Sequence, residues 1–178
     1  MSNENSLLDS LKSPTSNDHK EVSFYLAIAM AIVVGSALAF EHIGGYIPCA
    51  LCLEQRTPYY VGAPILVLAA LSKIITVPAI ITRLLILIAG LIMLYGMGLA
   101  AFHSGVEWLW WPGPESCGAA ADGLSGNAGD LLADLNAKRP PSCDKAALRV
   151  FGLSFAGWNV FTSAVLAFFT LRLAVRKA

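Results

Sequence analysis

Four cysteines are the residues of this chain best suited to carry chemistry: Cys49, Cys52, Cys117 and Cys143. Cys49 and Cys52 form a C-x-x-C pair, and a disulfide that closes so short a ring adds little stability. Such pairs are more typical of redox or metal sites than of structural bridges. Residues 118–142 separate the other two cysteines. A disulfide between them could be purely structural, contributing about 3–4 kcal/mol in the chain-entropy model.

Arg56 follows Cys52 by one helical turn, so the two side chains share a helix face. A cation there could lower the pKa of the Cys52 thiol and stabilise negative charge on a group bound beside it. Alternatively, Arg56 could extend to lipid headgroups. His103 ends a long apolar run, where it could be an interfacial residue or a ligand. Nearby polar residues are interpreted as interfacial caps or solvated loop charges: Glu54, Gln55, Glu107 and Glu115.

A zinc or copper site is an alternative use of the four cysteines together with His42 and His103. Structural zinc sites usually contain two close pairs of ligands, whereas only one pair here is close in sequence. An oxidising compartment also disfavours four thiolates. No metal is therefore predicted. A non-enzymatic protein that binds metal or holds static disulfides in the membrane stays open as the alternative function.

The composition is that of a membrane protein. Hydrophobic residues make up 56% and charged residues 13% of the 178 positions, and the mean hydropathy is +0.64. This balance excludes a disordered or collagen-like chain. The net charge is zero, which argues against nucleic-acid binding through bulk basic charge.

Uncharged apolar runs predict four membrane-spanning helices, at about 22–40, 59–75, 84–102 and 155–173. Residues 57–102 as one helix would be about 69 Å long, so this stretch must turn near residues 72–82. Ala37-Leu38-Ala39 resembles a signal cleavage site, but the preceding tail is long and polar instead of short and basic. We therefore predict an all-α integral membrane protein, with a disordered cytoplasmic tail over 1–21 and a four-helix bundle over 22–175.

Charge asymmetry predicts the orientation, because Lys and Arg favour the cytoplasmic side. The tail, the 72–82 turn and the C-terminus carry seven of the twelve basic residues: Lys12, Lys20, Lys73, Arg83, Arg172, Arg176 and Lys177. Both termini are thus predicted to be cytoplasmic, and loops 41–58 and 103–154 to face the opposite side of the membrane. All four cysteines fall in these two loops, where thiols can be oxidised. The second loop opens with three tryptophans suited to the headgroup region, and residues 130–137 predict a short interfacial helix.

The pattern of four spans, a C-x-x-C pair and a second cysteine pair resembles the DsbB family of disulfide-forming membrane proteins. Its most specific part is the stretch Pro48-Cys49-Ala50-Leu51-Cys52-Leu53-Glu54-Gln55-Arg56. Weaker agreement comes from His103 with Glu107-Trp108, and from Phe151-Gly152-Leu153 with Gly157-Trp158.

The resemblance implies a bacterial inner-membrane enzyme that reoxidises a periplasmic, DsbA-like thioredoxin-fold protein and passes the electrons to membrane quinone, either ubiquinone or menaquinone. By motif position, Cys117 would be attacked by the partner and Cys143 would resolve the mixed disulfide. The Cys49–Cys52 disulfide would reoxidise that outer pair. The resemblance further implies that Cys52 lies against the quinone with Arg56 beside it, and that His103 shapes the quinone pocket.

A vitamin K epoxide reductase-like protein is a neighbouring class that also couples thiols to quinone on a four-helix bundle. In that family the C-x-x-C pair lies near the last helices, which does not fit the early position of Cys49 and Cys52.

Overall fold

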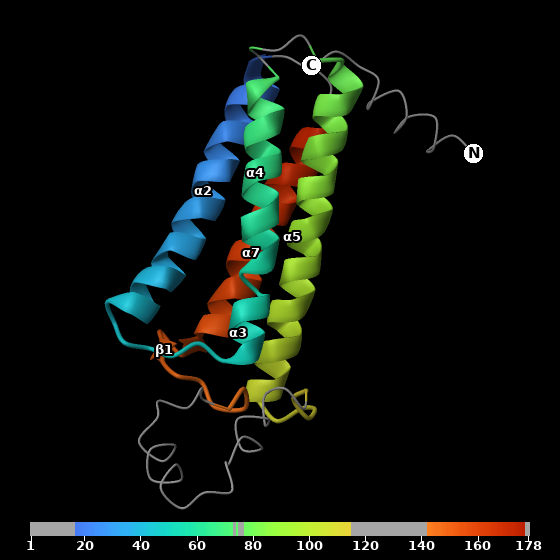
Figure 1. The fold of residues 1–178 in the computed structure, drawn as a ribbon. Helices are drawn as coiled ribbons and strands as arrows, with labels where there is room; N and C mark the ends of the chain where they lie inside the picture. The colour runs from blue at the N-terminus through green and yellow to red at the C-terminus, as the bar shows by residue number, and fades with distance from the viewer. Residues whose placement is uncertain (1–16, 73, 75–76, 115–141, 177–178) are drawn as a thin grey trace, which may run out of the picture.

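A computed structural model describes residues 17–72, 74, 77–114 and 142–176. Its elements, in chain order, are α2 (Asn17–His42), α3 (Ala50–Glu54), α4 (Thr57–Leu71), α5 (Ala79–Glu107), β1 (Arg149–Val150), β2 (Leu153–Ser154) and α7 (Phe155–Val175) (Figure 1). The predicted interfacial helix over 130–137, Cys117, Glu115 and the first sixteen residues of the predicted tail lie outside the described residues.

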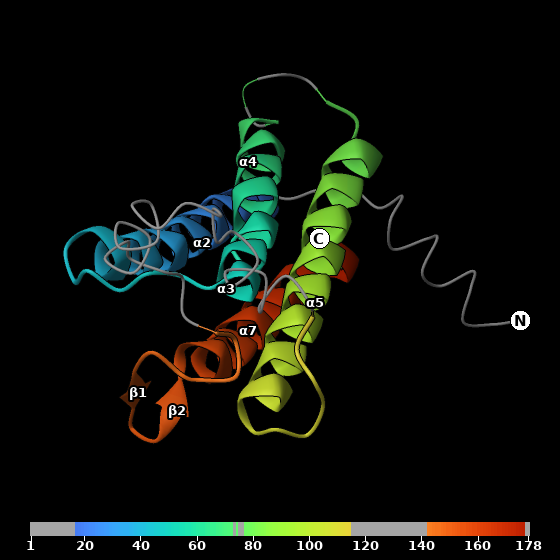
Figure 2. The ribbon, with the colours of Figure 1, turned by 60° about the horizontal axis from the view of Figure 1, so that its bottom comes forward.

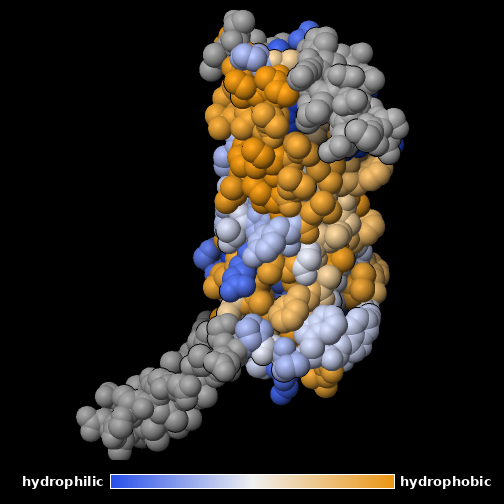
Figure 3. All heavy atoms as spheres, turned by 90° about the vertical axis from the view of Figure 1, so that its right-hand side faces the viewer, coloured by the Kyte–Doolittle hydropathy of each residue, from blue (hydrophilic) through white to orange (hydrophobic). Residues whose placement is uncertain are grey.

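The four long helices α2, α4, α5 and α7 pack side by side as a bundle (Figures 1 and 2). The predicted all-α membrane class is confirmed. Among the described helices, α2, α5 and α7 are long and apolar enough to cross a membrane. Helix α4 has 15 residues and is therefore about 22 Å long, shorter than a hydrocarbon core of about 30 Å. Apolar side chains cover much of the outer surface along the bundle (Figure 3).

Several helices begin earlier than the apolar runs predict. Helix α2 begins at Asn17 and α5 at Ala79, because helical geometry continues through polar residues outside the uncharged stretch. Asp18 in the first turn of α2 suits the positive end of the helix dipole. Helix α7 begins where the sequence predicts, since the Ser154 hydroxyl caps it by accepting from the Gly157 backbone N–H at 3.1 Å.

Small residues let the helices approach closely. A Cβ atom added to Gly90 on α5 would lie 2.6 Å from the Leu171 side chain of α7. At Gly96 the added atom would lie 3.0 Å from Pro58 at the start of α4. Because lipid tails are as apolar as the side chains, such close packing is a main source of helix association in membranes.

The start of α2, the end of α4, the start of α5 and the end of α7 lie together at one end of the bundle, and α3, which carries the C-x-x-C pair, lies at the other (Figure 1). At the first end, the His19 ring donates to the Arg176 carbonyl at 3.1 Å. The fully buried Arg83 guanidinium donates to the carbonyls of Ala174 and Arg176 at 2.9 and 2.7 Å. Toward the cysteine end, α2 leans away from the other helices (Figures 1 and 2).

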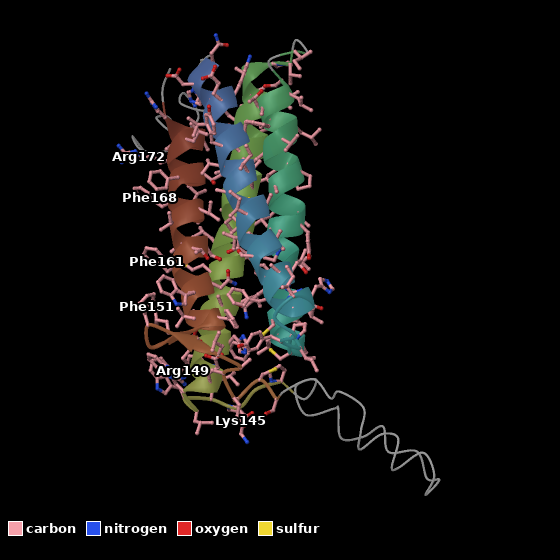
Figure 4. All side chains as sticks on the ribbon, turned by 90° about the vertical axis from the view of Figure 1, so that its left-hand side faces the viewer. Lys145, Arg149, Phe151, Phe161, Phe168 and Arg172 are labelled. Atoms are coloured by element: carbon pink, nitrogen blue, oxygen red, sulfur yellow. The ribbon has the colours of Figure 1, made fainter. Side chains whose placement is uncertain are left out.

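The two short strands form an antiparallel hairpin in which Arg149 pairs with Ser154. Phe151 and Gly152 turn the hairpin with positive φ angles of 51° and 83°. The Phe151 ring is 93% exposed and points away from the bundle (Figure 4). The Trp158 indole N–H donates to the Val150 carbonyl at 3.0 Å and ties the hairpin to α7.

Candidate functional site

The C-x-x-C pair lies at the start of the short helix α3, whereas the sequence suggests the head of the second long helix. Cys49 is the N-cap residue, and its sulfur accepts from the Cys52 backbone N–H at 3.2 Å. The two Sγ atoms are 2.7 Å apart, and both cysteines are free thiols. Cys49 is buried, while Cys52 is partly exposed. The chain bends between α3 and α4 at Gln55 and Arg56.

The two thiols have opposite pKa shifts, because they share one negative charge. The hydrogen bond between the two sulfurs, helped by His103, lowers the pKa of Cys49 to about 5 against the opposing effect of burial. The same bond, together with burial, raises the pKa of Cys52. The sequence-based prediction that Arg56 lowers the pKa of Cys52 is therefore wrong for the reduced pair. The causes of the Cys52 shift lie in Cys49, in burial and in Glu107.

His103, on α5, is buried against the pair. Its Nε2 atom is 3.7 Å from the Cys49 sulfur and its Nδ1 atom is 2.6 Å from the Gln55 side-chain nitrogen. Glu107, one turn further along α5, has a carboxylate oxygen 3.9 Å from Nε2. Glu107 is 9% exposed, so the interpretation of this residue as a solvated loop charge is wrong. The helix continues beyond the apolar run and carries the carboxylate into the protein.

Cys143 approaches the pair from the second loop. It is buried and disulfide-bonded, and its sulfur lies within 4.8 Å of the Cys49 sulfur and of a His103 ring nitrogen. Lys145, two residues after Cys143, projects at the same end of the bundle as the hairpin (Figure 4). The structure therefore brings together four of the residues that the sequence singles out: Cys49, Cys52, His103 and Cys143. The fourth cysteine, Cys117, lies outside the described residues.

The cluster of Cys49, His103 and Cys143 has the ligand types of a zinc or copper site. Metal ligation needs thiolates and an unprotonated ring nitrogen. The Cys143 sulfur is in a disulfide, so it is not available as a thiolate ligand. As arranged, the described groups suit thiol chemistry better than metal binding.

An apolar cavity of about 450 Å³ opens beside Cys52, within the size range of small-ligand sites. Its walls come from α2, the 46–48 segment, α3, α4, the hairpin and α7, and its polar lining includes Ser36, Glu41, Cys52, Gln55, Arg56, Tyr59, Asn159 and Thr162. Cys49 and His103 are not among the lining residues. The two cysteines of the pair thus face different surroundings, Cys52 the cavity and Cys49 the second loop.

Arg56 contributes a cation to the cavity wall. Its guanidinium pairs with the Glu41 carboxylate of α2 at 2.5 Å, and the two side chains are 12% and 26% exposed. The pair bridges α4 and the end of α2 at the point where α2 leans away. Arg56 therefore places its charge at the cavity, close to the C-x-x-C pair. Glu41, which the sequence analysis did not single out, holds the guanidinium there.

The sequence analysis also missed a polar chain across the bundle. The Asn159 amide donates to the Gln55 carbonyl oxygen at 2.7 Å, and the Tyr59 hydroxyl donates to the Asn159 oxygen at 2.5 Å. Ser163 also lies within hydrogen-bond distance of both Tyr59 and Asn159. A signal for Asn159 was present, since it is an amide within an otherwise apolar predicted span.

Comparison with known proteins agrees with this geometry. The family model described as "Disulfide bond formation protein DsbB" matches residues 19–173. The chain belongs to the DsbB family. A relative named Disulfide bond formation protein B, from Herminiimonas arsenicoxydans, is 27% identical over 163 residues, which cover 89% of this chain and 96% of the relative. No solved structure matches the chain. As a DsbB-family member, the protein is a disulfide-forming membrane protein with thiol oxidoreductase activity.

Proposed function

We propose that the protein oxidises the thiols of a soluble, DsbA-like thioredoxin-fold partner and delivers the electrons to a membrane quinone. The observation that carries this proposal is that the two sulfurs of the C-x-x-C pair have different surroundings. Cys49 lies within 4.8 Å of Cys143, while Cys52 lines the apolar cavity. One sulfur is placed for exchange with the second loop and the other for contact with a lipid-soluble acceptor.

The first half of the reaction is thiol–disulfide exchange. The partner's thiolate attacks Cys117, the bond to Cys143 breaks, and Cys143 leaves as a thiolate. Attack by the second partner thiol on the mixed disulfide releases the oxidised partner. Cys143 can attack the Cys49 sulfur of a Cys49–Cys52 disulfide, with Cys52 as the leaving thiolate, and closure of the outer disulfide leaves Cys49 and Cys52 reduced. The proximity of the Cys49 and Cys143 sulfurs supports this order.

The second half requires an acceptor in the cavity. A bound quinone would take two electrons and two protons from the reduced pair and so restore the Cys49–Cys52 disulfide. The cavity fits such a molecule, because its walls are apolar and Cys52, Arg56 and Tyr59 supply polar groups near one end. Arg56, held by Glu41, would donate hydrogen bonds to a carbonyl oxygen and stabilise negative charge that develops there. The apolar walls would exclude water.

The proposed orientation puts both termini in the cytoplasm and the cysteine end in the periplasm of a bacterial inner membrane. In support, the start of α2 and the end of α7 lie at the same end of the bundle (Figure 1), where basic residues prevail. A membrane-impermeant thiol reagent added to reduced spheroplasts should label Cys117 or Cys143. Labelling that requires membrane disruption would contradict the orientation.

Quinone reduction by the purified protein in detergent, with a reduced thioredoxin-fold oxidase as donor, tests the function. We expect donor-dependent turnover that is lost in Cys52→Ser. In Arg56→Ala we expect a higher quinone KM, because the cation lies at the cavity. His42→Gln, on an exposed side chain at the end of α2, should behave as the wild type. A folded, quinone-supplemented protein without turnover would refute the proposal and favour static disulfides.

A further inference from the structure

A continuous chain of side-chain hydrogen bonds links the buried cysteine to the wall of the cavity. It runs from Cys49 through His103, Gln55 and Asn159 to Tyr59. These five residues come from α4, α5, α7 and the two caps of α3. The three residues at the cavity end line the cavity as well. The chain thus connects both sides of the proposed electron route.

The direction of every bond in this chain follows from one backbone group. The Gln55 side-chain nitrogen lies 3.3 Å from the Leu51 carbonyl oxygen. A carbonyl can only accept, so the nitrogen and not the oxygen of the amide must face it. The Gln55 oxygen then points to Asn159, whose amide nitrogen donates to it at 2.7 Å. Rotating the Gln55 amide by half a turn would place its oxygen against the Leu51 carbonyl oxygen, so two acceptors would face each other. It would also place its nitrogen against the Asn159 amide nitrogen, so two donors would face each other.

The fixed Gln55 amide determines the state of the His103 ring. The Gln55 nitrogen donates to Nδ1 at 2.6 Å, so Nδ1 must carry a lone pair. The ring proton therefore resides on Nε2, which faces Cys49 at 3.7 Å. A second proton on Nδ1 would place two N–H groups against each other. Both side chains are at most 5% exposed, so water is poorly placed to relieve that conflict.

We propose that Gln55, oriented by Asn159 and the Leu51 carbonyl, is a positioning residue that holds His103 as the neutral Nε2–H tautomer and thereby supplies Cys49 with a permanent N–H donor. The inference rests on the proposed function and adds a mode of control to it. A neutral N–H donor stabilises the Cys49 thiolate to the same extent across the pH range in which a histidine normally titrates. An imidazolium would lose its charge within that range, and its stabilisation of the thiolate would fall with it.

Other titratable groups face the same ring nitrogen. Glu107 lies 3.9 Å from Nε2 on α5, and Cys143 approaches from the second loop. Cys52 is bonded to Cys49. Glu107 alone would favour a doubly protonated ring, so the Gln55 bond on the opposite nitrogen is the contact that opposes it. When Cys49 is in a disulfide and carries no charge, the Glu107 carboxylate, 3.9 Å from Nε2 and beyond hydrogen-bond distance, is the negative group that still faces the ring.

The tautomer can be read directly by ¹⁵N NMR of the full-length reduced protein labelled at histidine. His103→Gln identifies the His103 signals, and His42→Gln, on an exposed side chain, is the matched control that leaves them in place. We expect protonated Nε2 and unprotonated Nδ1 throughout about pH 5–8, the normal titration range of histidine. An Nδ1–H tautomer or an imidazolium in the wild type overturns the proposal, without any variant having to fold.

Two substitutions at Gln55 sharpen the test. Gln55→Glu replaces the donor by an acceptor for Nδ1–H and should produce the doubly protonated ring, whereas Gln55→Leu should give a mixture of tautomers. In a Cys117→Ser/Cys143→Ser background, the rate of Cys49 alkylation should gain a second step between about pH 6 and 8 in Gln55→Glu, and none in the parent background. Unchanged ring signals in both variants contradict the role of Gln55.

These readouts use neither quinone nor a partner protein. A correct tautomer in a protein that fails to reduce quinone would refute the proposed function and leave the positioning role intact. Quinone turnover in a protein with a different His103 tautomer would support the proposed function and refute the positioning role of Gln55.

Discussion

At the end of the bundle where α2 begins, the buried Arg83 guanidinium donates to the backbone carbonyls of Ala174 and Arg176, whereas at the cysteine end buried side chains bond to one another. Backbone carbonyls neither titrate nor change oxidation state, so the two Arg83 bonds stay the same through any thiol reaction. The thiols at the cysteine end do change. The comparison shows one fold using buried polar groups for anchoring at one end and for chemistry at the other.

The largest expected effect separates the two ends by activity. Cys52→Ser removes the sulfur that lines the cavity and should lower quinone reduction at least about 1,000-fold, as for other essential nucleophiles. Arg83→Met should leave the turnover of the folded protein unchanged. Steady-state assays corrected for the folded fraction measure both. Comparable losses in the two variants would break the functional distinction between the ends.

The second prediction concerns pH and the reduced cysteine pair. The pKa of Cys49 is lowered from 9.0 to about 5 in the folded protein, so folding favours its thiolate. Stability of the reduced protein should therefore rise between about pH 5 and 9 and be lost as the pH falls through 5. Each tenfold change in an acid dissociation constant corresponds to about 1.4 kcal/mol of stability. Above about pH 9 the raised pKa of Cys52 acts in the opposite direction.

Thermal unfolding in detergent, with the reduced and oxidised proteins side by side, measures this dependence. A Cys49–Cys52 disulfide does not titrate, so the oxidised protein should lack this contribution. Identical pH dependence of the two forms would contradict a shared thiolate.

The third prediction concerns the anchoring end. Arg83→Met leaves the carbonyls at the end of α7 without the guanidinium and should destabilise the protein by about 2–3 kcal/mol. Arg172→Met, an exposed arginine on α7, is the matched control and should change stability by less than about 0.5 kcal/mol. Equal effects would show that the buried donor is not an anchor. The pH titration of the cysteine pair should be the same in both variants.

A smaller effect is expected at Tyr59, where the cysteine-end network reaches α4. Tyr59→Phe removes the hydroxyl that donates to Asn159 and should cost about 1 kcal/mol in stability. Tyr60→Phe, on an adjacent exposed ring, is the control and should be nearly neutral. Denaturation curves for the two variants test whether the polar chain contributes to folding as well as to positioning.

The smallest effect is expected on treatment with a metal chelator. If the sulfur cluster works through thiols, chelation should change neither the melting temperature nor the turnover. Elemental analysis of the purified protein for zinc and copper checks this. Stoichiometric metal together with a chelator-induced loss of stability would support the alternative interpretation of Cys49, His103 and Cys143 as ligands.

The sequence allowed the parts of the site that depend on local spacing to be predicted. The Cys49–Cys52 pair, the cation four residues after it and the apolar runs are all visible along the chain. The residues that contact them in the folded protein were not visible in the sequence. Gln55 and Asn159 are 104 residues apart, and each taken alone is an ordinary polar residue. The predicted role of His103 at a quinone stays a prediction, while its contact with Cys49 emerges only from the packing of α3 against α5.

Element boundaries and burial were harder to anticipate for a related reason. Hydropathy follows the lipid-facing stretch, whereas a helix continues for as long as its backbone hydrogen bonds can form. Helix α5 therefore extends past the predicted span to Glu107 and buries a carboxylate that looks like a loop charge in the sequence. The break between α3 and α4 had one signal in the sequence, Pro58, which lacks a backbone N–H and is typical of the first turn of a helix.

The lean of α2 has a consequence for kinetics. It leaves the cavity bordered by exposed side chains such as Phe40 and Phe151, on a flank of the bundle that faces lipid. Under the proposed function, a quinone would reach this cavity from within the bilayer, so the concentration that governs its binding would be its mole fraction in the lipid, not its molarity in the sample. Adding lipid that contains no quinone, with the amounts of protein and quinone kept constant, should slow the reaction because it lowers the mole fraction of quinone in the bilayer.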